Sequence, residues 1–259
     1  MIMRALASLI PKNCKIEKIE TSPDVEHIRV FFNDVDAQHI ADFGFSPPTG
    51  KALLLFCGRG NTPTNCDVIL KETIHFGKRL LKEGYMIVVP NCGSDSWGSP
   101  DATTIALKVL ESLPCTGIRI PERLPVLGFS MGGLAALMFA VRHPDRIARI
   151  ADVFGAVDLA DIARRIESYT DNLTTLYPSP EVMAAATPLN YGKRLAQFPI
   201  AIYHGEDDEL ILPEYSRRMA QCLQENGGEV TFTMVPHYGH DNAILNAIAD
   251  DLLKFICQE

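Results

Sequence analysis

Short apolar runs that alternate with helical segments constrain the fold of this chain more than any other feature. Each run has the length of a buried strand and ends at turn-forming residues. The runs lie at 52–58, 85–90, 124–127, 147–155, 199–205 and 230–236. A strand followed by a helix and another strand folds as a right-handed crossover, which makes the two strands parallel. The chain is therefore predicted to be an α/β protein with a mostly parallel sheet covered by helices on both faces.

The segments around these runs complete the predicted domain. Helices are expected at about 65–82, 101–113, 134–141, 214–225 and 242–257, and antiparallel strands at 15–20 and 27–32. The stretch 158–192 has short helical pieces around "YPSP" and no strand signal, so it is expected to leave the sheet and return. Its place after a strand end favours a cap over that edge rather than surface decoration. Both halves of the chain are equally apolar, so residues 1–259 are expected to form a single domain with 158–192 as its cap segment.

Composition limits the partners of the protein. The formal net charge is −8 at pH 7 and Lys and Arg do not cluster, which argues against a nucleic-acid partner. The N-terminal "MIMRALASLIP" is too short for a signal peptide or a membrane span, so we expect a cytoplasmic protein without a membrane partner. Seven cysteines without paired short spacings indicate reduced thiols. No metal motif or dinucleotide loop occurs, so no cofactor is expected, and the sequence does not indicate an oligomeric state.

One serine stands at a predicted handover from strand to helix. "LPVLGFSMGGLAALMFA" (124–140) joins an apolar strand to a segment rich in Ala, Leu and Met, with Ser130 at the junction. A turn this tight crowds the backbone, so the residues two before and two after it must be small. Gly128 and Gly132 meet that demand. The side chain of Ser130 is therefore predicted to point outward, as a nucleophile's must.

A serine hydroxyl is a weak nucleophile until a histidine takes its proton, and that histidine needs an acceptor to fix its tautomer. Such groups collect at the carboxyl ends of parallel strands. "HGEDDEL" (204–210) and "HYGHDN" (237–242) both follow strand ends. They offer Glu206, Asp207 and Asp208 as acids and His237 and His240 as bases.

These motifs resemble those of the α/β-hydrolase superfamily over most of the chain from about residue 51. "GFSMGG" resembles its nucleophile elbow, "HGEDD" has the acid three residues after glycine, and "YGH" has the base. The resemblance implies the triad Ser130, Asp208 and His240. The pieces "ATPLNY", "HGEDDELILPEYSRRMA" and "GGEVTFTMVPHYGHD" also resemble the branch that contains dienelactone hydrolase and the prolyl-oligopeptidase-like enzymes.

Other residues compete for the same roles. Asp158, after the preceding strand, is the reserve acid, and His204 is expected to be a structural histidine at a strand end. His237 follows Pro236 at once, where the chain has barely turned. Gly239 can adopt a positive φ that swings His240 back towards Ser130, which favours His240 as the base.

The resemblance also implies an oxyanion hole made of backbone N–H groups. By the superfamily's pattern the donors are Met131, at the start of the helix after the elbow, and Arg59, in the loop after "LLLFCG". The family usually has His-Gly in that loop, whereas this chain has Cys57 in place of the histidine. Cys57 and Cys92 both follow strand ends, where either could be a reactive thiol, but the role of a buried apolar filler is favoured because nothing in the sequence indicates a lowered pKa.

The function that these residues predict is serine hydrolysis through an acyl-enzyme, with a small or medium carboxylic ester as the substrate. Thioesters and amides or peptides are alternatives, because the same groups cleave them. No propeller domain precedes the catalytic part in this sequence, which disfavours a size-gated oligopeptidase. A binding protein that keeps the triad on a hydrolase scaffold is the alternative outside enzymology.

Overall fold

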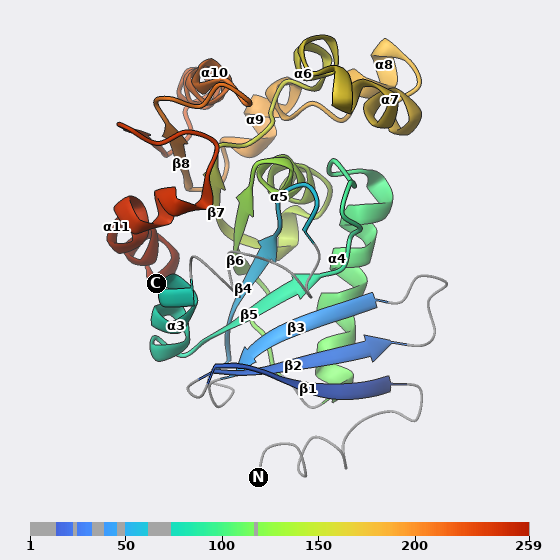
Figure 1. Cartoon of the computed structure of the whole chain (residues 1–259), viewed down its shortest axis with the longest axis vertical. Helices are drawn as coiled ribbons and strands as arrows, with labels where there is room; N and C mark the ends of the chain where they lie inside the picture. The colour runs from blue at the N-terminus through green and yellow to red at the C-terminus, as the bar shows by residue number, and fades with distance from the viewer. Residues whose placement is uncertain are drawn as a thin grey trace.

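The described strands form one sheet in which a parallel part is extended by an antiparallel part. The computed structural model describes residues 14–22, 25–32, 39–45, 50–61, 74–116 and 119–258. The strand order is β1-β2-β3-β5-β4-β6-β7-β8-β9, parallel from β5 to β9 and antiparallel from β1 to β5 (Figure 1). The bounds are β1 Cys14–Ser22, β2 Val25–Phe32, β3 His39–Phe45, β4 Lys51–Phe56, β5 Tyr85–Pro90, β6 Leu124–Phe129, β7 Ile147–Val153, β8 Ile200–Gly205 and β9 Val230–Val235. The predicted α/β fold with a mostly parallel sheet is confirmed.

Helices cover both faces of the parallel strands. Their bounds are α3 Ile74–Lys82, α4 Pro100–Ser112, α5 Met131–Arg142, α10 Pro213–Glu225 and α11 Leu245–Cys257. Alternate residues of β4 belong to two different cores: Leu54 belongs to the core that includes α4, α5 and α10, whereas Leu53 and Leu55 belong to the core that includes α3 and α11. Both faces of β4 are buried, which is why its sequence is a continuous apolar run.

The predicted elements agree with the observed ones where the chain is described. The pairing of 15–20 with 27–32 is observed as the antiparallel pair of β1 and β2. The helix expected at 65–82 is observed from Ile74, and its earlier part lies outside the described residues. The strand β3 was not predicted, because "HIADFGF" lacks both a continuous apolar run and a regular alternation.

The stretch between β7 and β8 consists of short helices joined by turns and contains no strand, as predicted. It consists of α6 Leu159–Arg165, α7 Glu167–Leu176, α8 Pro180–Ala184, η3 Pro188–Tyr191 and α9 Gly192–Leu195, and α6 to α8 project beyond the sheet at the end where α10 lies (Figure 1). Ser179 begins α8 by accepting a hydrogen bond from the N–H of Val182, and Pro180 occupies the first turn. Asp158 caps α6 in the same way, by accepting the N–H of Asp161.

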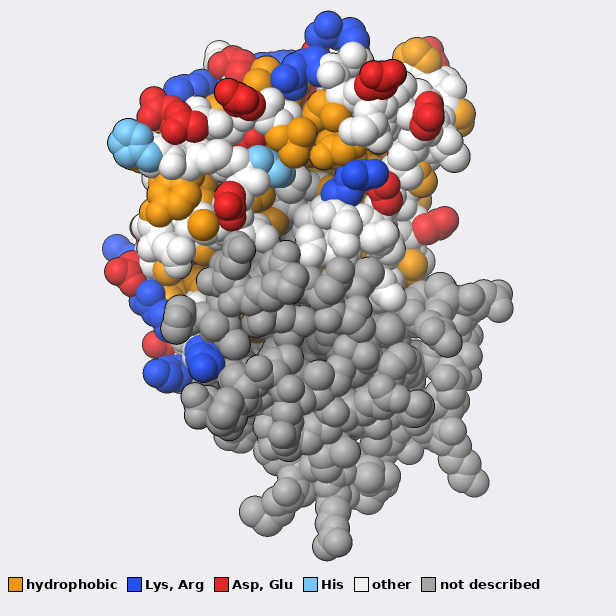
Figure 2. Space-filling model, viewed as in Figure 1, with side chains coloured by type: hydrophobic (Ala, Val, Ile, Leu, Met, Phe, Trp, Pro, Cys, Tyr) orange, Lys and Arg blue, Asp and Glu red, His pale blue; other side chains and the backbone are white. Residues whose placement is uncertain are grey.

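The described surface mixes both signs of charge. Figure 2 shows acidic and basic side chains interspersed over the described part of one face, with hydrophobic side chains gathered between them. None of the helices in the described ranges has both the length and the apolarity that crossing a membrane requires.

Candidate active site

Ser130 occupies a tight turn between β6 and α5. Its φ of 55° and ψ of −118° lie outside the regions that non-glycine residues favour. A Cβ at Gly128 would lie 2.1 Å from the carbonyl oxygen of Gly132, and a Cβ at Gly132 would lie 2.1 Å from that of Phe56. The N–H of Ser130 donates to the carbonyl of Val153 at 3.0 Å, which ties the turn to β7. The predicted demand for small residues on both sides of the serine is confirmed.

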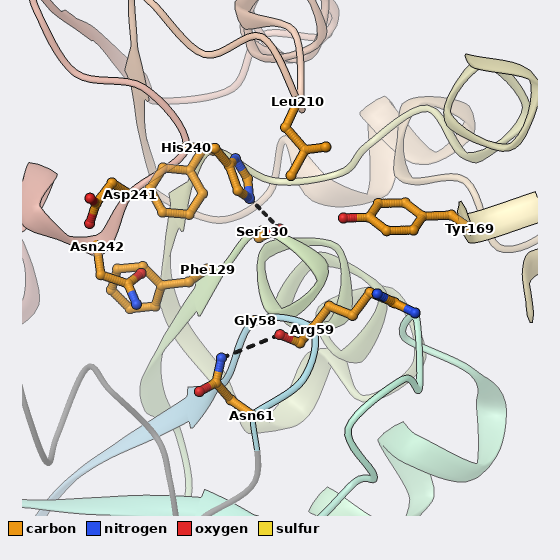
Figure 3. Close-up of a pocket in the computed structure, with 11 residues that line it drawn as sticks. Gly58, Arg59, Asn61, Phe129, Ser130, Tyr169, Leu210, His240, Asp241 and Asn242 are labelled. Carbon is orange, nitrogen blue, oxygen red and sulfur yellow. Dashed lines mark hydrogen bonds between the residues drawn. The ribbon is translucent and has the colours of Figure 1, made fainter. Parts of the chain in front are cut away.

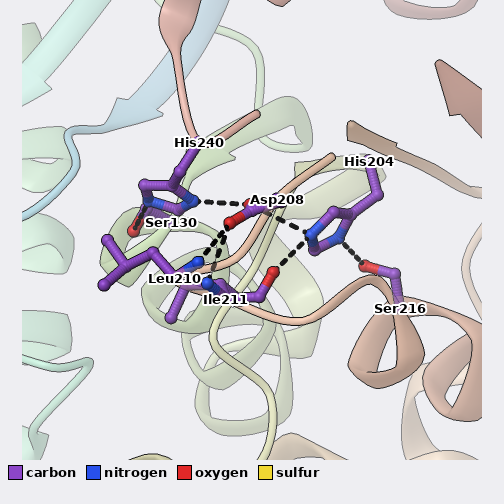
Figure 4. Close-up of polar contacts among 7 residues, drawn as sticks. All are labelled: Ser130, His204, Asp208, Leu210, Ile211, Ser216 and His240. Atoms are coloured by element: carbon purple, nitrogen blue, oxygen red, sulfur yellow. Dashed lines mark hydrogen bonds and ion pairs between the residues drawn. The ribbon is translucent and has the colours of Figure 1, made fainter. Parts of the chain in front are cut away.

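The structure brings Ser130, His240 and Asp208 into one hydrogen-bonded chain (Figure 4). The Nε2 of His240 lies 2.8 Å from the Oγ of Ser130, and its Nδ1 lies 2.7 Å from Oδ2 of Asp208. A neutral imidazole fits both contacts by donating from Nδ1 to the carboxylate and accepting the serine hydroxyl at Nε2. The residues are joined across 110 positions of sequence between Ser130 and His240 and 32 between His240 and Asp208.

Asp208 is buried and accepts a hydrogen bond from each of four groups. The N–H groups of Leu210 and Ile211 donate to Oδ1 at 3.0 and 2.9 Å, and the rings of His240 and His204 contact Oδ2. Burial alone would raise the pKa of Asp208, but the hydrogen bonds from His204 and His240 outweigh it and lower the pKa to about 2. The carboxylate therefore stays charged at neutral pH although its side chain has no access to solvent.

His204 is the neighbour that sequence reasoning described only as structural. It is fully buried, with Nε2 at 3.1 Å from Oδ2 of Asp208 and 2.8 Å from the carbonyl oxygen of Ile211 (Figure 4). Because that carbonyl can only accept, Nε2 carries the hydrogen. On the other side of the ring, Nδ1 lies within hydrogen-bonding distance of the hydroxyl of Ser216, at 2.7 Å. His204 thus links the acid of the site to α10.

The path of the chain to His240 corrects one prediction. Gly239 does not adopt a positive φ; His237 does, with a φ of 66°. The turn therefore starts earlier than expected, and the chain passes so close to β8 that a Cβ at Gly205 would lie 2.2 Å from the carbonyl oxygen of Tyr238. Asp241 then caps the next helical turn, its carboxylate accepting the N–H of Ala243 at 2.8 Å.

The reserve acid has other partners. Asp158 caps α6 by accepting the N–H of Asp161, and its other carboxylate oxygen pairs with Arg218 at 2.7 Å. The structure does not bring Asp158 into contact with His240, whose carboxylate partner is Asp208.

The loop after β4 approaches Ser130 from the opposite side to His240. A Cβ placed at Gly58 would lie 3.7 Å from the Cβ of Ser130. Arg59, the predicted donor of this loop, comes next, and Met131 is the first residue of α5. In the part of the chain that the structure describes, neither of their N–H groups has a backbone acceptor. An N–H group without a backbone acceptor is what an oxyanion hole requires.

A cavity of about 280 Å³ opens onto Ser130 and His240 (Figure 3). Its remaining lining comes from the loop after β4, the ends of β6 and β7, α7 and the loops after β8 and β9. These residues are Gly58, Arg59, Asn61, Phe129, Phe154, Tyr169, Leu210, Asp241 and Asn242. The hydroxyl of Tyr169 points towards Ser130 in Figure 3, although sequence reasoning did not single out this residue.

The thiol of Cys92 is held in its protonated form. Its Sγ donates to the carbonyl of Ala102, and burial raises its pKa to about 12. A thiol that stays protonated is a poor nucleophile, in agreement with the role of apolar filler.

Comparisons with known proteins place this chain among hydrolases. The sequence pattern of the prolyl oligopeptidase family matches residues 80–258. Esterase YjfP of Escherichia coli (strain K12) is 28% identical over 146 residues, a stretch that covers 54% of this chain and 57% of the esterase.

Solved structures share the fold at low sequence identity. An S-formylglutathione hydrolase from Agrobacterium tumefaciens is similar with a TM-score of 0.72 at 16% identity, over 93% of this chain and 98% of that chain. FphF, a fluorophosphonate-binding serine hydrolase from Staphylococcus aureus, is similar with a TM-score of 0.69 at 12% identity, over 95% and 98% of the two chains. The α/β-hydrolase fold inferred from the motifs is confirmed.

Proposed function

Because the chain belongs to the prolyl oligopeptidase family, we propose that it is a serine hydrolase that cleaves carboxylic esters of small or medium size. The observation that carries the proposal is the hydrogen-bonded chain from Ser130 through His240 to Asp208, which opens onto a cavity. The esterase activity named for YjfP supports an ester as the substrate.

The mechanism follows from the positions of the three side chains. Nε2 of His240 accepts the proton of Ser130 while Oγ attacks the ester carbonyl, and Asp208 stabilises the imidazolium that forms. The backbone N–H groups of Met131 and Arg59 donate to the oxyanion of the tetrahedral intermediate. His240 then gives the proton to the leaving alcohol, which leaves an acyl group on Ser130. A water molecule, deprotonated by His240, releases the acid and regenerates the serine.

The size of the cavity supports small substrates. About 280 Å³ lies just below the usual range of roughly 300–1,000 Å³ for ligand pockets. The polar side chains of Asn61, Tyr169 and Asn242 contribute to the lining, which suits polar ester groups better than long acyl chains.

A peptidase or amidase activity is the second candidate, because the matching family takes its name from an oligopeptidase. The same groups would form the acyl-enzyme, with an amine in place of the alcohol as the leaving group. Thioester hydrolysis differs only in its leaving thiol.

We extend the proposal to the organisation of the chain. Residues 1–259 form one hydrolase domain, with 158–192 as a cap; Tyr169 of α7, which lines the cavity, supports this role. The partner is a small molecule rather than a nucleic acid, as the net charge of −8 favours. The cytoplasm is the proposed location, since the seven cysteines show no paired short spacing.

Covalent labelling tests the proposal directly. We expect a fluorophosphonate probe to label the wild-type protein, and the Ser130→Ala variant to fold normally and remain unlabelled. A panel of p-nitrophenyl esters, thioesters and aminoacyl amides, assayed with both proteins, then ranks the substrate classes. Labelling of another serine in the variant, or a correctly folded wild type that neither reacts with the probe nor hydrolyses any substrate, would refute the assignment and favour a binding protein.

A further inference from the structure

The loop between β5 and α4 holds the proposed oxyanion loop in two ways. The N–H of Gly60 donates to the carbonyl of Ser94 at 2.7 Å. The guanidinium of Arg59 forms two parallel hydrogen bonds with the carboxylate of Asp95, from Nε at 3.0 Å and from Nη2 at 2.9 Å. Both groups are partly exposed, and a bidentate geometry is the one in which such an ion pair still contributes.

Asp95 is itself held by a buried anchor. The indole Nε1 of Trp97 donates to Oδ1 of Asp95 at 2.5 Å, and the Trp97 side chain is 1% exposed. The carbonyl of Trp97 accepts the hydroxyl of Tyr177 at 2.7 Å. The carboxylate that binds Arg59 therefore has a fixed position.

The same loop packs against the helix that begins at the elbow. A Cβ at Gly98 would lie 2.7 Å from Cδ2 of Leu134 and 3.1 Å from Cα of Ala135, both in α5. Arg142, at the end of α5, donates from Nη1 to the carbonyl of Gly98 at 2.6 Å. Residues 94–98 thus contact both structures that offer an N–H group to the substrate: the loop with Arg59 and the helix α5, which Met131 begins.

Tyr169 completes the enclosure of Arg59. The guanidinium carbon lies 4.7 Å from the centre of the Tyr169 ring, and that ring lies 5.1 Å from the ring of Trp97. Figure 3 shows the Arg59 side chain extending below Tyr169, away from Ser130. The side chain of Arg59 therefore works as an anchor beside the site, whereas its backbone remains near the serine.

We propose that Asp95 is a positioning residue for the transition state: by holding Arg59, it keeps the N–H of Arg59 aligned with the N–H of Met131 on one oxyanion. This inference rests on the proposed function. An oxyanion donor must lie about 2.7–3.1 Å from the developing charge, and losing one donor costs about 10²–10³ in kcat. If the loop is released from Asp95, the N–H of Arg59 is still present but is less well aligned. The loss in kcat should therefore be smaller than when a donor is removed.

The test compares Asp95→Ala with Asp101→Ala, a matched control at an exposed carboxylate in the first turn of α4. We expect Asp95→Ala to lower kcat by about 10- to 100-fold with KM changed less than about twofold. Its affinity for a boronic acid that forms a tetrahedral adduct with Ser130 should fall by a similar factor. Asp101→Ala should match the wild type in all three quantities.

A second pair of variants separates positioning from general stability. Asp95→Asn keeps an oxygen for Trp97 but loses the charge that binds Arg59, so it should show a reduced kcat with little change in melting temperature. Arg59→Ala should reduce kcat on its own and add nothing when combined with Asp95→Ala, because both remove the same anchor. Additive losses, a change confined to KM, or full kcat in folded Asp95→Ala and Asp95→Asn would overturn the inference. An inactive wild type would instead overturn the proposed function.

Discussion

The two sides of Ser130 are held in place by different means. On the side of His240, side chains do the work: the acid accepts four hydrogen bonds, and all of its partners lie in the segments 204–211 and 240. On the side of Arg59, the proposed working groups are backbone N–H groups, and side chains from other segments, Asp95 and Tyr169, contact the side chain of Arg59. A role that depends on an imidazole or a carboxylate restricts the residue type. A role that needs only a backbone N–H leaves the residue that carries it free to vary. It restricts instead the neighbouring residues that hold this N–H in position.

Substituting the base should give the largest effect on the first side. We expect His240→Ala to lower kcat by a factor on the order of 10⁶, as the loss of the histidine does in a serine protease triad. His237→Ala, three residues earlier, should retain most of the activity because His237 has no contact with Ser130 or Asp208 among those that the structure describes. Steady-state hydrolysis of a p-nitrophenyl ester by both variants measures the difference. An active His240→Ala protein would show that His240 is not the base, and the comparison of the two sides of Ser130 would no longer apply.

Substituting the acid should give a smaller loss on the same side. Asp208→Asn removes the charge that stabilises the imidazolium and leaves the size of the side chain unchanged, so kcat should fall by about 10⁴. Asp207→Asn is the matched control, because that side chain is exposed and has no part in the hydrogen-bonded chain. Equal losses in the two variants, measured by the same ester assay, would move the acid away from Asp208.

The smallest of the three effects should come from His204, which lies behind the acid. Replacing it with Leu removes one hydrogen bond from the carboxylate, and we expect kcat to fall roughly tenfold, whereas His204→Gln keeps a donor and should lose less. The carboxylate stabilises the fold above its ordinary pKa of 3.8, and that contribution is lost as the pH falls through the folded value of about 2. With one of the hydrogen bonds that lower this pKa gone, the carboxylate of Asp208 should stabilise the His204→Leu variant less at neutral pH, and the variant's stability should fall less between about pH 4 and pH 2.

Denaturant unfolding of the wild type and both His204 variants, from about pH 6 down to pH 2, measures how the free energy of unfolding depends on pH in each protein. His204→Gln should follow the wild type more closely than His204→Leu does. If the free energy of unfolding falls in the same way at low pH for all three proteins, His204 does not lower the pKa of Asp208.

The residues on the side of His240 can be predicted from the sequence, whereas most of the contacts on the side of Arg59 cannot. Local patterns suffice for the strand ends and for the elbow, because Gly128 and Gly132 answer a steric demand that any such turn makes. The path from β9 to His240 was predicted less well: glycine's freedom suggested Gly239, yet His237 takes the positive φ. The path of this loop is determined by its close contact with β8. The sequence of the loop does not indicate that contact.

Contacts between residues that are far apart in the sequence were not predicted, for a related reason. Asp95 and Arg59 are 36 positions apart, and neither belongs to a motif that ties one to the other. Tyr169 reaches the cavity from α7, in a stretch whose sequence indicates helices but not the direction of their side chains. Pairings of this kind depend on how the loops at the strand ends meet, which is a property of the folded chain.

The separation of 110 residues between Ser130 and His240 has a consequence in time. A ribosome adds about 5–20 residues per second, so roughly 6–22 s pass between the synthesis of the serine and that of the histidine. During this interval the nascent chain has its serine but not its base, and the hydroxyl remains as unreactive as that of any other serine. The order of the residues along the chain thus delays catalytic competence until the last parallel strand and the loop that follows it have been made.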